Sequence, residues 1–568
     1  MTSLSREASA VDAIAEDYMT KLAALDPFGA TAIGIPGYDH LVTDLSPAGL
    51  SARAELDRAT LSALDSVDPT DEIDAVSIAA MRERLGLAVE TFESGWAHAD
   101  LNNIASPLQG MRDLFDLQPV ATVQDWENIA SRLSLLPTSI AGYIESLRFG
   151  AASGKVPAKL QVTLGAAEAR ENANEDETFF LKFVTSDDAT KIIETSENAA
   201  DLGARLKDAA LATARAYGEL ADFLETELLP QAPEKDAAGR ERYELASRQF
   251  LGATIDLDET YEWGLAELAR IVAEQQAIAE ELYGPGTTVE QAVENLDKDD
   301  RYILRSKDEL KAWMQETADK AIRELNGVHF DIPEPVQTIE CMIAPTQTGG
   351  IYYTPPTDDF SRAGRMWWSV PPSVTTFNTW REKTTVFHEG VPGHHLQCAQ
   401  AVYLRDTLNS WRRLACWVSG HGEGWALYSE RLMEDLGYLE DPADRLGMLD
   451  GQRLRAARVV LDIGVHLEKP CPEEWGGGIW DSEKAWEFLK ANVNMPEAFV
   501  RFELNRYLGW PGQAPSYKVG QRLWEQIRED ARAAAEARGE EFSLKDFHER
   551  ALALGSVGLD VLGEALAG

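Results

Sequence analysis

Histidine and glutamate residues gather in one short segment of this 568-residue chain, which reads His388-Glu389-Gly-Val-Pro-Gly-His394-His395. In the usual zinc helix, His-Glu-x-x-His, two histidines four residues apart bind zinc through imidazole nitrogens, and the glutamate between them acts as a general base on water. The residue types of this segment therefore predict a zinc site able to hydrolyse an amide bond.

The second histidine is not at its usual position. Pro392 lies four residues after His388, and His394 follows two residues later. In a continuous helix, six residues give about 9 Å of rise and about 120° of misalignment, which would separate the two imidazoles. Because Pro392 and Gly393 break or bulge helices, we expect the segment to loop out and return His394 to the face of His388. His395 is the alternative second ligand, but about 10 Å of rise is too long for one metal ion.

A later segment, Ser-Gly-His421-Gly-Glu423-Gly-Trp-Ala-Leu-Tyr-Ser-Glu430-Arg431, can supply the third ligand. Glu423 follows the first segment by enough residues for one helix to end and a second to pack beside it. Glu430 lies on the same helical face, where it could orient a ligating imidazole or pair with Arg431. We predict zinc bound by His388, His394 and Glu423, with His395, His421 and Glu430 in supporting or substrate-contacting positions.

The rest of the chain must position these side chains. In residues 1–335 apolar residues recur at spacings of three and four, which predicts a helical scaffold. Residues 336–372 contain short segments rich in aromatic and β-branched residues, which predict a small antiparallel sheet. Residues 373–568 return to the helical pattern and contain both motifs. We therefore expect a single mostly α-helical domain over residues 1–568, with a groove whose floor carries the zinc site.

Composition restricts the partners and the location. The 53 basic and 95 acidic residues give a net charge of −42, which argues against binding to nucleic acid or to an anionic membrane. The N-terminus lacks the pattern of a signal peptide, and no run approaches the roughly twenty apolar residues of a membrane span. The four cysteines are dispersed, which suits a reducing compartment. These features predict a cytoplasmic protein that binds neither nucleic acid nor membrane.

Two motifs, HEGVPGHHLQ and EGWALYSE, resemble the signatures His-Glu-x-x-Pro-Gly-His-His-x-Gln and Glu-Gly-Trp-Ala-x-Tyr-x-Glu of the bacterial domain of unknown function 885 (DUF885) family. The segments RAARVVLDIGVH and RYLGWPGQAPSYKVG extend the resemblance. That family is similar to the thermostable carboxypeptidase (carboxypeptidase Taq) family and, more distantly, to thimet-type oligopeptidases. The resemblance implies a large helical gluzincin-like metallopeptidase fold with a groove, and a ligand at Glu423 followed by a second glutamate at Glu430.

Hydrolysis of a peptide bond creates a charged oxygen that needs a hydrogen-bond donor opposite the metal. His466 and Tyr517 are candidates for this donor, followed by Tyr507, although each could instead be a core residue. Arg506 and Lys518 could bind a substrate carboxylate or form ordinary ion pairs.

Together these residues predict a zinc-dependent peptidase, a carboxypeptidase or an oligopeptidase, in which Glu389 moves the proton to the leaving amine. A metal-dependent amidase acting on a small acylated compound, and a non-catalytic metal-binding module, are the alternatives. The expected partner is a peptide or small amide substrate, and a homodimer is possible.

Overall fold

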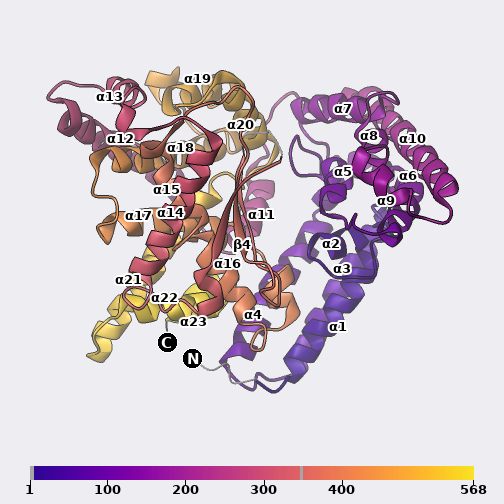
Figure 1. The fold of residues 1–568 in the computed structure, drawn as a ribbon, viewed down its shortest axis with the longest axis horizontal. Helices are drawn as coiled ribbons and strands as arrows, with labels where there is room; N and C mark the ends of the chain where they lie inside the picture. Colours follow the sequence, from indigo (N-terminus) through magenta and orange to yellow (C-terminus); the bar gives the residue numbers. More distant parts are fainter. Residues whose placement is uncertain (1–5, 346–349, 568) are drawn as a thin grey trace.

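Most of the described chain is helical. The computed structural model describes residues 6–345 and 350–567, which form helices around two small sheets (Figure 1). The N-terminal helices are α1 (Ala10–Leu25), α2 (Pro27–Ala32), α3 (Pro47–Leu64), α4 (Glu72–Glu93), α5 (Pro107–Leu117), α6 (Val123–Ala152), α7 (Lys159–Ala173), α8 (Phe179–Val184), α9 (Asp187–Ile193) and α10 (Ala199–Phe223). They are followed by α11 (Arg240–Leu251), α12 (Leu257–Tyr283), α13 (Val289–Leu296), α14 (Lys307–Leu325), α15 (Thr379–Glu389), α16 (His394–Tyr403), α17 (Ser419–Asp435), α18 (Pro442–His466), α19 (Ser482–Asn492), α20 (Glu497–Gly509), α21 (Ser516–Arg538), α22 (Leu544–Ala553) and α23 (Leu559–Leu566).

Capping residues fix where the two longest helices of the C-terminal part begin. α18 begins at Pro442, whose fixed φ suits the first helical position, and the Asp441 carboxylate accepts a hydrogen bond from the Ala443 amide. α12 begins after Asp256, whose carboxylate accepts hydrogen bonds from two amides of the first turn. These caps satisfy amides that have no partner within the helix, and the two helices pack against each other.

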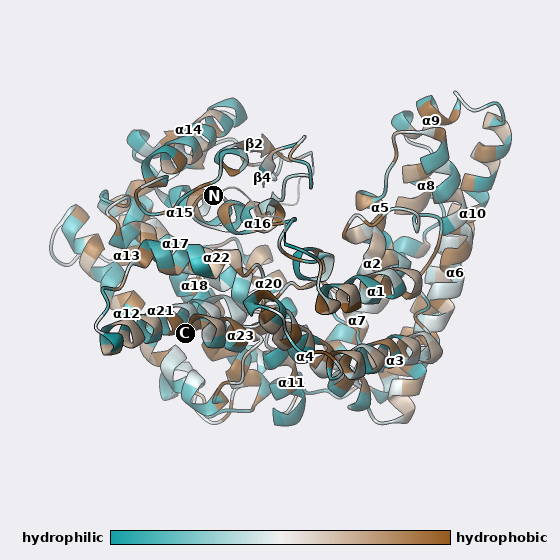
Figure 2. Ribbon diagram, turned by 90° about the horizontal axis from the view of Figure 1, so that it is seen from below, coloured by the Kyte–Doolittle hydropathy of each residue, from teal (hydrophilic) through white to brown (hydrophobic). Residues whose placement is uncertain are grey.

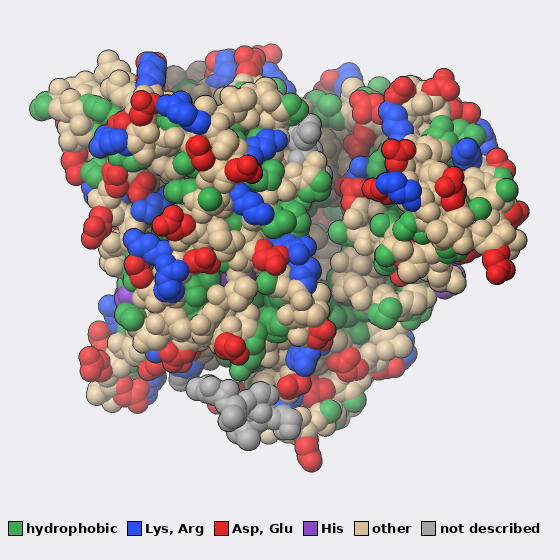
Figure 3. Space-filling model, in the orientation of Figure 1, with side chains coloured by type: hydrophobic (Ala, Val, Ile, Leu, Met, Phe, Trp, Pro, Cys, Tyr) green, Lys and Arg blue, Asp and Glu red, His purple; other side chains and the backbone are tan. Residues whose placement is uncertain are grey.

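Buried apolar side chains form two separate hydrophobic cores. The smaller core lies within residues 101–232, which we call the distal lobe and which contains α5 to α10. The larger core unites α1, α4 and the helices from α11 onward, which we call the main lobe. The distal lobe projects beside the main lobe (Figures 1 and 2), and the surface is hollowed between them (Figure 3). The boundaries predicted at residues 335 and 372 mark changes in secondary structure. They do not coincide with the division between the two hydrophobic cores.

The sheet predicted over residues 336–372 is present, but it is mixed and not antiparallel. The described strands are β1 (Ile303–Leu304), β2 (Ile339–Ile343), β3 (Ile351–Thr354), β4 (Gly364–Trp368) and β5 (Phe377–Asn378). β4 lies between the other two strands of the larger sheet, antiparallel to β3 and parallel to β2. The expectation of antiparallel pairing was wrong because side-chain alternation identifies strands but not their order in the sheet. The segment containing β3 connects β2 to β4, which are parallel neighbours. β5 lies directly before α15 and pairs with β1 in a separate antiparallel sheet.

Four helices of the main lobe surround the histidine motif. α15 packs against α17 and α18, and α17 packs against α21. Gly424 of α17 and Gly520 of α21 lie in close contact, because a Cβ atom on Gly424 would lie 2.5 Å from the carbonyl carbon of Gly520. Small residues at this crossing bring the beginning of α21 next to Glu423.

Charged side chains cover much of the surface (Figure 3). Many of them form exposed ion pairs, such as Arg148 with Glu227 at 3.0 Å in the distal lobe. Within the described ranges, no helix has both the length and the apolar character needed to cross a membrane.

Candidate metal centre

The segment between the two histidines is a break between helices. α15 ends at Glu389, and α16 begins at His394. The Gly393 amide donates a hydrogen bond to the carbonyl of Phe387 at 3.0 Å, and a Cβ atom on Gly393 would lie 1.9 Å from the carbonyl oxygen of His388. Glycine is therefore required at this close approach. The segment returns His394 toward His388, as expected, although through a full break and not through a bulge in one helix.

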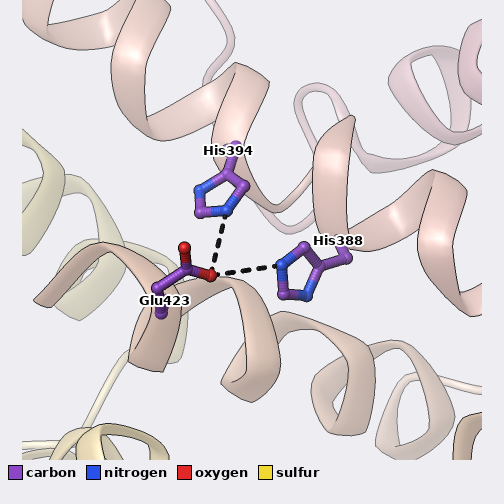
Figure 4. A group of neighbouring side chains, drawn as sticks. All are labelled: His388, His394 and Glu423. Atoms are coloured by element: carbon purple, nitrogen blue, oxygen red, sulfur yellow. Dashed lines mark ion pairs between the residues drawn. The ribbon is translucent and has the colours of Figure 1, made fainter. Parts of the chain in front are cut away.

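Three side chains from three helices converge at this break (Figure 4). Nε2 of His388 lies 3.5 Å, and Nε2 of His394 lies 3.4 Å, from the same carboxylate oxygen of Glu423. The three potential ligand atoms all lie within 4.8 Å of one another. Ligand atoms of a tetrahedral zinc site with bonds of about 2.0–2.1 Å are about 3.3–3.4 Å apart, so the observed spacing suits a small metal ion. This buried group could hold a metal ion.

Neighbouring side chains fix the orientation of this group. Nδ1 of His388 lies 2.8 Å from Oε1 of Glu430, and Thr384 donates a hydrogen bond to the other oxygen of this carboxylate. This contact leaves Nε2 of His388 for a metal ion. Trp425 of α17 donates from Nε1 to the carbonyl of Pro392 at 2.8 Å, which ties the helix of Glu423 to the break. Nδ1 of His394 has no hydrogen-bond partner among the described residues.

The charges around the two histidines favour a bound cation. Burial lowers the pKa of His388, but its contacts with Glu423 and Glu430 and the charge of Glu389 raise it to about 10 in the metal-free protein. Burial raises the pKa of Glu423, but the two histidines bring it well below its usual value. The carboxylates that stabilise a proton on His388 would also stabilise a metal ion that replaces this proton.

Glu389 is buried at the end of α15, directly after the ligand position His388. Burial raises its pKa, the histidines lower it, and the nearby charge of Glu423 raises it further, so that the pKa lies above its usual value. A raised pKa is the property expected of a carboxyl group that accepts and releases a proton during catalysis.

His395 and His421 lie outside the group of ligand atoms. His395 contacts the Tyr353 hydroxyl at 2.9 Å through Nδ1 and the Val336 carbonyl at 2.7 Å through Nε2. Both ring nitrogens therefore connect α16 to the larger sheet and the segment before it. Nδ1 of His421 lies 3.1 Å from the amide of Gln397, and burial lowers the pKa of His421 to about 3.

His466 and Tyr507 are core residues. Nε2 of His466 lies 2.9 Å from the Tyr507 carbonyl, and its Nδ1 accepts a hydrogen bond from the Ala238 amide at 3.2 Å. The Tyr507 hydroxyl accepts from Arg458 at 2.7 Å and donates to Glu503. The expected role of His466 as an oxyanion donor does not fit the structure, because both ring nitrogens already have backbone partners.

Lys518 and Arg506 also have protein partners. Nζ of Lys518 is buried 3.0 Å from Glu267, so the expected role of Lys518 in binding a substrate carboxylate does not fit. Arg506 contacts Glu503 at 3.3 Å and donates to Gln513, but its buried Nε has no partner within the described residues. Arg506 thus remains a candidate for a contact with substrate.

Tyr517 lies in the first turn of α21 and is partly exposed. Burial and the charge of Glu423 raise its pKa, and the hydroxyl of the preceding residue, Ser516, lies 2.8 Å from the hydroxyl of Ser419 in the helix of Glu423. The charge of Arg455 on α18 opposes the rise in pKa of both Glu389 and Tyr517. Arg455 was not predicted as a site residue, and its signal in the sequence is its place one helical turn before Arg458.

Comparison with known proteins supports the fold. A crystal structure described as the "putative lipoprotein" from Colwellia psychrerythraea is 23% identical and has a TM-score of 0.82, with 98% of this chain and 99% of that chain covered. The structure of a "putative lipoprotein of unknown function" from Shewanella oneidensis is 17% identical and has a TM-score of 0.76, with 99% and 100% covered. No curated protein matches the chain.

The comparison with family models covers nearly the whole chain. The model described as bacterial protein of unknown function (DUF885) matches residues 27–566. This range includes the histidine motif, Glu423 and both lobes, and the chain therefore belongs to the DUF885 family.

Proposed function

We propose that this protein is a zinc-dependent peptidase with a gluzincin-like site. The observation that carries the proposal is the position of a buried glutamate, Glu389, directly beside a group of two histidines and a third carboxylate with spacing suited to zinc. Two imidazoles and one carboxylate form the ligand set of many catalytic zinc sites, which leave a fourth position for water or substrate.

His388, His394 and Glu423 would hold the ion. Zinc bound there would supply a Lewis acid that polarises a carbonyl group and activates water near neutral pH. Glu389 would accept the proton of the attacking water and deliver it to the leaving amine. Tyr517, in the first turn of the helix that packs against the helix of Glu423, would donate a hydrogen bond to the oxygen that becomes charged.

The edge of the larger sheet supports an extended peptide as substrate. β3 is an edge strand, and Tyr353 within it contacts His395 beside the metal ligand His394. An extended peptide that pairs with an exposed strand edge gains main-chain hydrogen bonds. Such a peptide would run beside the metal centre. An amidase with the same ligands would not need this edge.

The proposal is tested with Glu389→Gln. This variant keeps the side-chain volume but cannot accept a proton, so we expect turnover of a mixed-peptide substrate to fall about 10²- to 10⁴-fold while the metal content stays unchanged. Elemental analysis and a cleavage assay provide the two readings. Normal cleavage by the variant would refute the role of Glu389. Cleavage of small N-acyl compounds but not of peptides would favour the amidase, and bound metal without either activity would favour a binding module.

A further inference from the structure

Three arginines lie on α18 and α20, two helices of the main lobe that pack against each other, and α18 also packs against α21, the helix that carries Tyr517. We propose that Arg455, Arg458 and Arg506 form a subsite that binds a carboxylate group of the substrate. This inference rests on the proposed function and deepens it, because such a subsite selects peptides that carry a carboxylate close to the cleaved bond.

Each arginine has an unused hydrogen-bond donor. Nε of Arg455, Nη1 of Arg458 and Nε of Arg506 are buried without a hydrogen-bond partner among the described residues. Arg458 is only 6% exposed. Buried guanidinium groups are costly unless their donors are satisfied, so a ligand that brought an acceptor to these three donors would remove this cost.

The positive charges of the cluster exceed its negative charge. Glu503 contacts Arg458 at 2.8 Å and Arg506 at 3.3 Å, and their charges hold its pKa near 2 although burial opposes this. Arg455 forms no ion pair within the described ranges, and its Nη1 donates only to the carbonyl of Gly451 at 3.2 Å. Glu503 thus pairs with two of the three guanidinium groups, in a chain whose net charge is −42. A local positive site in an acidic protein suits an anionic ligand group.

The position of the cluster connects it to the reaction. The guanidinium carbon of Arg458 lies 4.9 Å from the ring centroid of Tyr517. Tyr517 in turn lies in the first turn of α21, which packs against the helix of Glu423. A carboxylate bound by the arginines would thus lie on the Tyr517 side of the metal centre.

A terminal carboxylate and an acidic side chain offer the same chemistry, and a binding experiment can separate them. The probes are hippuryl-phenylalanine, its amide, and hippuryl-glutamate 1-amide, titrated calorimetrically into zinc-loaded Glu389→Gln protein. We expect the first probe to bind at least about tenfold more tightly than its amide if the terminus is bound. Tighter binding of the glutamate amide than of the phenylalanine amide would assign the subsite to acidic side chains.

In zinc-loaded Glu389→Gln protein that also carries Arg455→Gln, hippuryl-phenylalanine should bind less than about threefold more tightly than its amide. Arg455→Lys in the same protein keeps the positive charge but lacks the planar guanidinium group, so it should retain part of the preference for the acid over its amide. Partial retention would show that the loss in Arg455→Gln comes from the missing charge and not from misfolding. The matched control is Arg453→Gln on the same helix, whose Nε, Nη1 and Nη2 donate to Asn492, Gln275 and the carbonyl of Ala491. This control should leave the preference unchanged.

Equal binding of the acid and both amides, or an unchanged preference in Arg455→Gln, would overturn the subsite. Failure of the proposed function looks different, because the wild-type protein would then cleave no peptide while the binding preference persisted. A wild-type enzyme that cleaves acid and amide peptides equally well would retain the function but not the subsite.

Discussion

Buried polar side chains of the distal lobe mostly contact the backbone, whereas several of those around the candidate metal centre contact other ionisable side chains. In the distal lobe, Arg132 donates to the carbonyls of Leu41 and Tyr38 at 2.7 and 2.8 Å, and Tyr217 donates to the carbonyl of Leu108 at 3.0 Å. In the main lobe, His388 contacts Glu430, Arg458 contacts Glu503, and Lys518 contacts Glu267. Contacts with the backbone stabilise a fold, whereas clustered ionisable groups shift one another's pKa values and suit chemistry.

The distal lobe gives the largest expected effect on stability. Replacing Arg132 with Met leaves several buried acceptors without a donor, and we expect the free energy of unfolding to fall by about 3–5 kcal/mol. Metal content should not change, because Arg132 contacts no residue of the metal centre. Chemical denaturation and elemental analysis would measure both quantities.

The matched control for this variant is Arg148→Met on the same helix, which removes an exposed ion pair with Glu227 and a contact with the ring of Phe223 and should cost less than about 1 kcal/mol. If Arg132→Met lost its metal as readily as its stability, the contrast between the two lobes would not hold.

The second effect lies in the metal centre. Glu430→Gln keeps an acceptor for His388 but removes the charge that orients it, so we expect metal affinity to fall about 10- to 100-fold with little loss of stability. Competition with a chelator measures this affinity. Glu434→Gln, on the same helix and paired with Arg431 at 2.6 Å, is the control and should bind the metal as the wild type does. If both variants bound the metal with equal affinity, Glu430 would have no role in orienting His388.

The smallest effect concerns pH. Burial raises the pKa of Asp462 to about 7, although hydrogen bonds from Tyr243 and Gly512 oppose the shift. Because the unfolded chain loses this proton near pH 4, the carboxyl group lowers stability progressively between about pH 4 and pH 7. We expect the unfolding free energy of Asp462→Asn to rise relative to that of the wild type from pH 5 to about pH 7 and then to level off. A pH-independent difference in unfolding free energy would contradict the raised pKa.

Much of the candidate metal centre could be predicted from sequence because ligand chemistry restricts residue types. His388, His394 and Glu423 were identified by type and spacing, and the glycine and proline between the histidines indicated that the helix could not continue. The roles of His466 and Lys518 could not be predicted, because nothing in sequence shows that their polar atoms meet partners from distant segments.

The helical pattern was also visible in sequence, but the arrangement of the elements was not. Apolar spacing predicts helices, yet it does not reveal that residues 101–232 form a core of their own. Similarly, strand patterns located the larger sheet without showing that β4 lies between β2 and β3. Both properties depend on contacts between segments far apart in the chain.

The central claim is that His388, His394 and Glu423 bind a metal ion, and metal content measures it most directly. Elemental analysis of the wild type and of His388→Ala, His394→Ala and His395→Ala should find about one zinc ion per chain in the wild type and in His395→Ala. The other two variants should lack it. Retention of zinc by His394→Ala together with its loss from His395→Ala, or a wild-type protein that binds no metal when supplied with zinc, would contradict the account.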